Sequence, residues 1–318
     1  MFRGLVAFLA LQMAVAGFAM AAAAPEQVQG LYEGACKIAG VQQNLEARVV
    51  ALKDGYKVLI RQAGADGKVA KVELKGTAEK LEGQAGNVAW TGSYADGAIK
   101  GTCGDGTFQI AKVQRKSPTL GAKPPAGAIV LLDGKNFDEL TKGKLKDGSE
   151  QQWKITEDGA IEVPKGGMRS SKAITGSFKM HVEFKCPLMP AAEGQGRGNS
   201  GCYLPNGDEI QVLDSFGMTT YQGGGCGGLY RYKDPDAFDE FSLASLPPLE
   251  WQTYDIEYTV RKEDGKLVGK PRVTVFHNGI RIHDNVELSR DAKPGTLHWQ
   301  DHGNPVQYRN IWVLPIDQ

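Results

Sequence analysis

The chain has 318 residues, 41% of them hydrophobic, with 37 basic and 37 acidic side chains. Because the charges balance, no net field favours nucleic acid or an anionic membrane surface, and neither is an expected partner. The length allows one or two domains with real cores, and the 41 glycines indicate a turn-rich β protein.

Residues 1–24 have the composition of a secretory signal peptide. Arg3 gives the positive start, Leu5 to Phe18 form the apolar centre, and Ala19 to Ala24 offer small-residue cleavage sites. The apolar centre is short for a membrane span, and no later segment approaches about 20 apolar residues. We therefore expect a periplasmic or secreted protein with no membrane insertion after signal removal.

Residues 26–116 are predicted to form a small, accessory antiparallel β sheet or barrel. Short runs of alternating character are separated by Asp-Gly dipeptides, which are hairpin signals. The predicted strands cover residues 45–52, 56–61, 69–74, 88–94, 98–102 and 107–113. The region has no His and no clustered chemistry. The following Pro- and Gly-rich residues 117–127 are predicted to be a semi-rigid linker.

Residues 128–318 are predicted to form a larger all-β domain. Phe178 to Cys186 alternates, with Phe178 inward and Glu183 outward, and Asn278-Gly279 marks a strong hairpin. Further strands are predicted at residues 153–155, 160–163, 254–260, 272–277, 280–283, 297–300 and 310–314. So many short strands with turn punctuation indicate a β-sandwich. The outer face of a curved sheet in such a sandwich can form a groove.

The stretch from Glu193 to Asp214 carries the first candidate site. A polar, Gly-rich loop is followed by two extended runs, and in the second run Ile210 and Val212 should enter the core. Glu209 and Gln211 then share the other face. A carboxylate and an amide side by side can hold a sugar, although an ordinary exposed strand face has the same pattern.

Three further groups are candidates. Glu183 lies on the outward face of its strand, where a merely solvated position is the alternative. Asp301 and His302 follow a predicted strand, where His302 can act as a base near neutral pH or the pair can cap a turn. Tyr230 follows a run of glycines and could stack on a sugar or pack in a core.

Five cysteines are present, Cys36, Cys103, Cys186, Cys202 and Cys226. They form no CxxC pair and no zinc-finger spacing, so structural thiols or disulfides are expected, and Cys36 could pair with Cys103. Motifs of serine hydrolases (GxSxG) and zinc proteases (HExxH) are absent from the sequence.

Eight segments occur in the order found in one family: 131–135, 198–201, 209–214, 228–230, 251–253, 278–279, 300–303 and 308–311. Over roughly residues 128–316 the chain resembles the 3-keto-disaccharide hydrolase domain family, which has a concanavalin A-like jelly-roll β-sandwich fold. Gln252 and Cys202 depart from the common pattern. The resemblance implies action on sugars whose C3 hydroxyl has been oxidised to a ketone. The groove residues it implies are Asn199, Ser200, Glu209, Gln211, Asp214, Gln300, Asp301, His302 and Arg309.

A C3 ketone acidifies the C2 proton and makes the C1 glycosidic oxygen a β-leaving group. One base and donors for the enolate then suffice for elimination, after which water adds. The base would be His302 or Glu209, and the enolate donors would be Asn199, Gln211 or Arg309. A divalent metal held by Glu209, Asp214 or His302 could replace those donors, although no ligand spacing requires it.

Two alternatives stay open at this point. Ordinary hydrolysis would pair Glu209 with Glu183 or Asp214, two carboxylates roughly 5 to 9.5 Å apart. A non-catalytic carbohydrate-binding module would use the same sandwich without chemistry, but such modules usually expose aromatic side chains, whereas this candidate groove is mostly polar.

Overall fold

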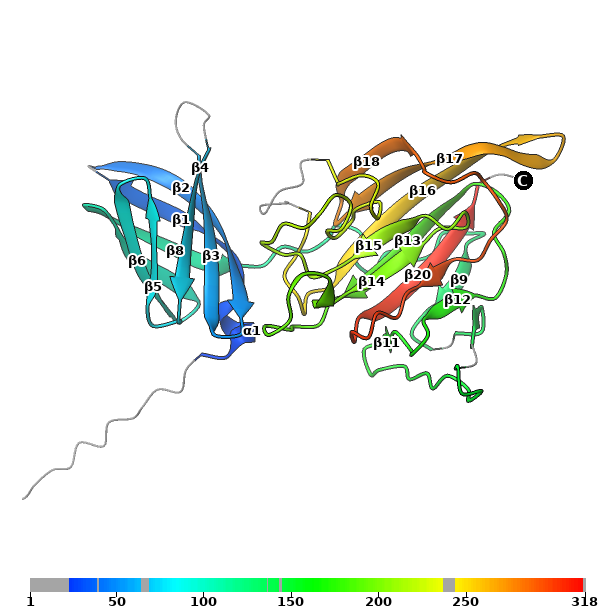
Figure 1. The fold of residues 1–318 in the computed structure, drawn as a ribbon, viewed down its shortest axis with the longest axis horizontal. Helices are drawn as coiled ribbons and strands as arrows, with labels where there is room; N and C mark the ends of the chain where they lie inside the picture. The colour runs from blue at the N-terminus through cyan, green and yellow to red at the C-terminus, as the bar shows by residue number, and fades with distance from the viewer. Residues whose placement is uncertain are drawn as a thin grey trace, which may run out of the picture.

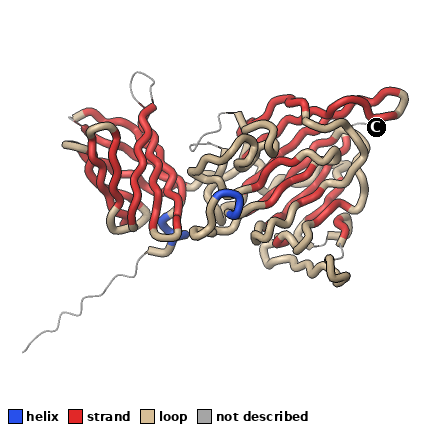
Figure 2. Tube along the Cα trace, in the orientation of Figure 1, coloured by secondary structure: helices blue, strands red, loops and turns tan. Residues whose placement is uncertain are grey.

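The computed structural model describes residues 23–38, 40–63, 69–135, 137–142, 145–236 and 244–316. Nearly all of its regular structure is β, arranged as a barrel and a sandwich (Figures 1 and 2). The predicted all-β fold class is therefore confirmed. Most of the predicted signal peptide lies outside the described residues. Within them, no helix combines the length and apolar character needed to cross a membrane.

The N-terminal unit is a closed antiparallel barrel whose strands follow chain order. After the short helix α1 (Pro25–Val28), the strands are β1 (Gly30–Ile38), β2 (Val41–Leu52), β3 (Gly55–Ala63), β4 (Val69–Gly76), β5 (Leu81–Ala85), β6 (Val88–Ala95), β7 (Ala98–Cys103) and β8 (Gly106–Val113). Pairing of β1 with β8 closes it. The prediction missed β1 and β5, whose glycines interrupt the alternation. At Gly34 a Cβ would collide with the Gln109 carbonyl, so this crossing of β1 and β8 requires glycine.

The C-terminal unit consists of two antiparallel sheets. One has the order β10 (Leu140–Thr141), β12 (Met168–Ser170), β19 (His298–Trp299), β14 (Ser200–Tyr203), β15 (Glu209–Val212). The other has the order β11 (Ile161–Glu162), β20 (Gln307–Pro315), β13 (Phe178–Lys185), β16 (Gln252–Glu263), β17 (Lys266–His277), β18 (Ile280–Glu287), with β9 (Ile129–Leu132) paired to β20. A short 3-10 helix, η1 (Gly194–Gly196), precedes β14.

The core lies between these two sheets. Ile210 and Val212 of β15 are fully buried in it, as predicted, together with Trp299 of β19 and Phe184 of β13. Burying an aliphatic or aromatic side chain of this size contributes roughly 1.5–3 kcal/mol. Because strand side chains alternate, this packing turns the neighbouring residues of β14, β15 and β19 to the outer face of their sheet.

The barrel is docked on the sandwich through a small apolar cluster. Leu31 and Val50 of the barrel bury their side chains against Phe216 and Leu246 of the sandwich. Gly217 stands at φ +63°, and a Cβ there would come within 2.6 Å of a Val50 methyl. The approach of the two units at this point therefore depends on glycine.

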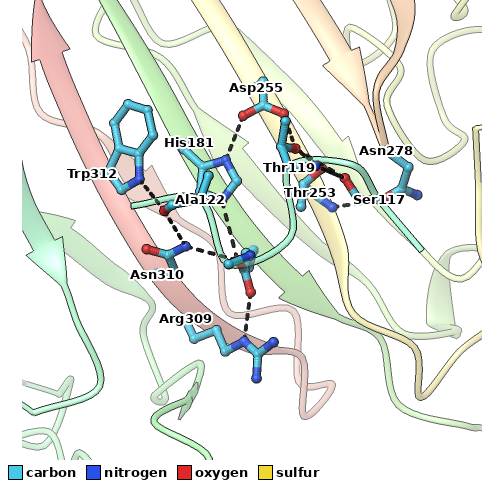
Figure 3. A network of polar contacts seen from close by, with 12 residues as sticks. Ser117, Thr119, Ala122, His181, Thr253, Asp255, Asn278, Arg309, Asn310 and Trp312 are labelled. Atoms are coloured by element: carbon cyan, nitrogen blue, oxygen red, sulfur yellow. Dashed lines mark hydrogen bonds and ion pairs between the residues drawn. The ribbon is translucent and has the colours of Figure 1, made fainter. Parts of the chain in front are cut away.

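Residues 117–122, which we call the strap, lie across the outer face of the larger sheet (Figure 3). The hydroxyls of Ser117 and Thr253 are 2.6 Å apart, and Thr119 donates to Asp255 at 2.6 Å. The Gly121 amide donates to Glu183 at 2.5 Å. The first six residues of the predicted linker, 117–122, are thus held against the sandwich.

The strap buries a charged cluster that the sequence had suggested would be solvated. Burial lowers the pKa of His181, but hydrogen bonds to Asp255 and Glu183 outweigh it and raise the value to about 9. Burial likewise opposes ionisation of Glu183, yet bonds from His181, Asn310, Arg309 and the strap amide bring its pKa to about 2. The solvated-face interpretation of Glu183 is therefore wrong, since only 1% of this residue is exposed.

Candidate functional site

A row of polar side chains crosses the outer face of the smaller sheet. The register pairs Arg169 with His298, His298 with Tyr203, and Tyr203 with Glu209. Because adjacent strands are about 4.8 Å apart, this row spans about 14 Å from Arg169 to Glu209. The Tyr230 amide donates to the Glu209 carbonyl at 3.0 Å, which places Tyr230 directly beyond the row.

A second, parallel row lies beside the first. The backbone amide of Gln300 donates to the backbone carbonyl of Gly201 at 2.9 Å, and Gly201 is paired with Gln211 across the two strands. A Cβ at Gly201 would collide with a carboxylate oxygen of Glu209, so the carboxyl group lies over this glycine. The two rows together make up what we call the polar face. The sequence prediction that Glu209 and Gln211 share an outward face agrees with this arrangement.

Glu209 has the electrostatics of a general base. Only 6% of the residue is exposed. Burial raises its pKa to about 7, against the opposing effects of a hydrogen bond with Tyr203 and the charge of Arg290. A carboxyl group whose pKa lies near the working pH can accept a proton from a reacting carbon with a useful driving force.

Three neighbours define the state of this carboxyl group. Burial and the nearby Glu209 raise the pKa of Tyr203, so its hydroxyl stays protonated. Gln300 donates to that hydroxyl at 3.3 Å. The His298 ring lies 5.1 Å from the Tyr203 ring, and burial together with the charge of Arg169 lowers the His298 pKa to about 4, so its imidazole is neutral.

Tyr203, Arg169 and His298 were not among the predicted site residues. The signal was available in the sequence for Tyr203. Cys202 to Asp214 was predicted as two strands joined by a turn, and pairing the strands about that turn sets Tyr203 opposite Glu209. Arg169 could not be found in this way, because its strand reaches the site only through β19.

Three amide side chains form a cluster at one end of the polar face. The side-chain oxygen of Gln195 accepts hydrogen bonds from the side-chain amide groups of Gln211, at 2.9 Å, and Asn199, at 3.1 Å. The side-chain carbonyl oxygens of Asn199 and Gln211 are buried and have no hydrogen-bond partner within the described residues. An unpaired buried acceptor costs about 1–3 kcal/mol.

Two predicted groove residues lie in the interior instead. The Ser200 side chain points to the opposite face of β14 from Tyr203. Its hydroxyl accepts a hydrogen bond from Tyr308 at 2.7 Å and donates one to the backbone carbonyl of Gln300 at 2.6 Å. Asp214 forms a buried ion pair with Arg197 at 2.7 Å. Burial raises the Asp214 pKa to about 6, although the Arg197 charge opposes the shift. Placing Ser200 and Asp214 in the groove was therefore wrong.

Glu183 and Arg309 were also placed in the groove, and this too was wrong. They belong to β13 and β20 of the larger sheet, where they form an ion pair at 2.7 Å. The Arg309 guanidinium also lies 4.0 Å from the centre of the Trp251 ring. Neither Glu183 nor Asp214 is therefore available as a second carboxylate beside Glu209.

Asp301 and His302 follow β19 in a loop next to the polar face. The Asp301 carboxylate accepts from the Gly166 amide at 2.9 Å and from the Gly303 amide at 2.8 Å, which is a capping arrangement. His302 is exposed, and within the described residues it forms no hydrogen bond or ion pair with Glu209. Asn304 ties the loop to the site, because its side chain accepts from the Asn199 amide at 2.7 Å. Catalytic roles for Asp301 and His302 stay predictions.

Tyr230 lies at the other margin of the site with a second tyrosine. Its hydroxyl is 2.9 Å from that of Tyr221. The Arg231 guanidinium lies 5.5 Å from the centre of the Tyr230 ring and 5.8 Å from that of Tyr221. Part of the Tyr230 ring is accessible, so its predicted stacking on a sugar remains a prediction consistent with this position.

The described residues contain no group of three or more His, Cys, Asp and Glu side chains placed to hold a metal ion. Asp214 in particular is held by Arg197 in the interior. The cysteines Cys36, Cys103, Cys186, Cys202 and Cys226 are all buried free thiols.

Comparisons with known proteins show which family the chain is similar to. No curated protein matches the chain. Among solved structures, a candidate glycosyl hydrolase from Parabacteroides distasonis ATCC 8503 is similar, with a TM-score of 0.51 and 31% identity, over 60% of this chain and 85% of that one. The family model of the 3-keto-alpha-glucoside-1,2-lyase-like domain matches residues 127–314. The chain therefore belongs to the 3-keto-alpha-glucoside-1,2-lyase-like domain family.

Proposed function

We propose that this protein cleaves the glycosidic bond of 3-keto-glycosides by elimination, and that it acts after export. The observation that carries the proposal is Glu209, a buried carboxyl group with a pKa of about 7 that lies beside the protonated hydroxyl of Tyr203. Family membership and the solved glycosyl hydrolase support action on a glycoside. The sequence of residues 1–24 supports export.

The reaction requires one base and one acid. Glu209 takes the C2 proton, whose acidity comes from the neighbouring C3 ketone, and the electron pair forms an enolate. The enolate then re-forms the ketone as the C1–O bond breaks, which leaves a C1–C2 double bond and an alkoxide that must be protonated. Water adds across that double bond, its hydroxyl to C1 and a proton to C2, and gives the free 3-keto sugar.

The polar face offers a group for each need. Tyr203 can donate its hydroxyl proton to the departing oxygen, and Gln300 orients that hydroxyl from the other side. Neutral His298 can donate to the enolate oxygen from its ring nitrogen without adding a positive charge. The unpaired amide oxygens of Asn199 and Gln211 are closed to solvent, so they would accept from sugar hydroxyls only after a side-chain movement.

Neither two-carboxylate hydrolysis nor a non-catalytic binding role has comparable support. Two-carboxylate hydrolysis needs a partner for Glu209, yet Glu183 lies on the other sheet and Asp214 is paired in the interior. A binding module has no use for a carboxyl group whose burial raises its pKa, because a charge-neutral amide would bind a sugar hydroxyl at lower desolvation cost.

The purified protein is expected to release the aglycone from a 3-keto-glucoside and not from the unoxidised parent glucoside. The reason is that the C2 proton is acidic only beside the ketone. The measurement is aglycone release from the matched pair under identical conditions. Cleavage of both compounds would favour ordinary hydrolysis, and binding of both without cleavage would favour a lectin role.

A further inference from the structure

A cleft of about 550 Å³ lies between the barrel and the sandwich. The barrel lines it with Lys53, at the turn between β2 and β3, and Lys75, near the end of β4. The sandwich lines it with Ala192 and Glu193, from the loop that precedes β14. No motif in the sequence pointed to this cleft, because its walls are more than 100 residues apart in the chain.

The walls of the cleft are held in place by two sets of contacts. The first is the apolar cluster in which Val50 packs against Phe216. The second is Arg197, whose guanidinium donates to the Ala51 carbonyl of the barrel at 3.3 Å and to the Met189 carbonyl of the sandwich loop at 3.2 Å. Arg197 is also fixed by its ion pair with Asp214. The cleft is therefore a built feature of the docked units.

The cleft and the polar face meet at one stretch of the chain, residues 194–195. Gly194 lines the cleft, and the next residue, Gln195, bonds to both Gln211 and Asn199. Gln211 lies two positions along β15 from Glu209, a separation of about 7 Å. A chain-like ligand with one unit at Glu209 would therefore have to pass Gln195 to place further units in the cleft.

The lining suits uncharged sugar units. Two basic side chains, Lys53 and Lys75, are matched by two acidic ones, Asp54 and Glu193, so the rim has no net charge but many donors and acceptors. Apolar groups such as Met218 lie between them and can cover the carbon face of a sugar ring. A strongly anionic ligand would meet the two carboxylates.

We propose that this cleft is a subsite for the distal sugar units of an oligosaccharide substrate, so that the barrel takes part in substrate binding. The proposal rests on the polar face being the place where the glycoside is cleaved. It gives the barrel, which lies outside the matched family domain, a direct role in choosing longer substrates.

The test compares Ala192→Trp, which fills the cleft, with Ala191→Trp, whose position on the same loop does not line it. The full-length proteins are assayed with 3-keto derivatives of cello- and malto-oligosaccharides of two to five units. In the wild type, KM should fall at least tenfold from the shortest to the longest member of the better series. Ala192→Trp should abolish that fall and leave KM for the disaccharide within about twofold, while Ala191→Trp should behave as wild type.

Calorimetric titration with the unoxidised oligosaccharides separates this proposal from the proposed function. If the keto compounds are not cleaved but affinity still grows with chain length and is reduced by Ala192→Trp, the reaction assignment fails and the subsite stands. Lys53→Ala should reduce the same length dependence, and Lys100→Ala, elsewhere on the barrel, should not. Affinity that is independent of chain length in both series, or unchanged by Ala192→Trp, would overturn the subsite.

Discussion

Replacing Glu209 by Gln is expected to lower kcat/KM for a 3-keto-glycoside at least about 100-fold, because general-base help of this kind is worth roughly 10²–10⁴. The amide keeps the shape of the side chain and cannot accept the C2 proton. In the wild type, kcat/KM should rise with pH and level off above about 7, since only the ionised carboxylate acts as base and burial raises the Glu209 pKa to about 7. Steady-state kinetics across pH 5–9 provides the measurement.

Two variants serve as controls for this result. Glu162→Gln removes an exposed carboxylate of the same domain and should leave the kinetics unchanged. His302→Ala removes the other candidate base, and we expect a loss of less than tenfold because that side chain is exposed and forms no hydrogen bond or ion pair with Glu209 among the described residues. A 100-fold loss in His302→Ala with near-normal rates in Glu209→Gln would transfer the role of base to His302.

Replacing Arg197 by Met is expected to destabilise the sandwich by about 3–5 kcal/mol, because it leaves Asp214 buried without its partner. Both side chains of the pair are only 1% exposed. The variant should also loosen the barrel, since Arg197 donates to the Ala51 carbonyl. Urea unfolding, followed by intrinsic fluorescence and circular dichroism, gives the change in stability.

The matched control is Arg281→Met, which breaks an exposed pair with Asp284 on the same sandwich. Pairs of that kind contribute about 0–1 kcal/mol, so its midpoint should scarcely move. Adding Asp214→Leu to Arg197→Met should restore part of the lost stability, because no unpaired charge is then buried. Equal small losses for Arg197→Met and Arg281→Met would contradict the structural role given to the buried pair.

The strands were largely predictable from sequence, because alternation and turn dipeptides act over short distances. The same parity rule predicts that Ile210 enters the core, as observed, and that Glu209 points to the opposite face of its strand. The parity rule also predicts the position of Ser200. Ser200 lies two positions from buried Cys202, so both side chains point to the same, inner face of the strand. The error of placing Ser200 in the groove came from applying the family resemblance without the strand parity.

The composition of the site was less predictable, because it depends on which sheet each strand joins. Glu183 and Glu209 are both outward-facing carboxylates, yet β13 and β15 belong to opposite sheets of the sandwich. Burial of Glu183 follows from the strap, whose Gly121 amide bonds to it from 62 positions earlier in the chain. No local pattern reveals such a long-range contact, and the same holds for the docking of the barrel beside Gln195.

The most direct test of the account is the fate of the hydrogen at C2 during cleavage in D2O. If Glu209 removes that proton and water then adds, the released 3-keto sugar should carry deuterium at C2 at the first turnover, beyond the exchange seen without enzyme. Nuclear magnetic resonance or mass spectrometry of the product measures it. Release of the aglycone with the original hydrogen still on C2, together with no primary kinetic isotope effect for a substrate deuterated at C2, would contradict the elimination and the role of Glu209 as its base.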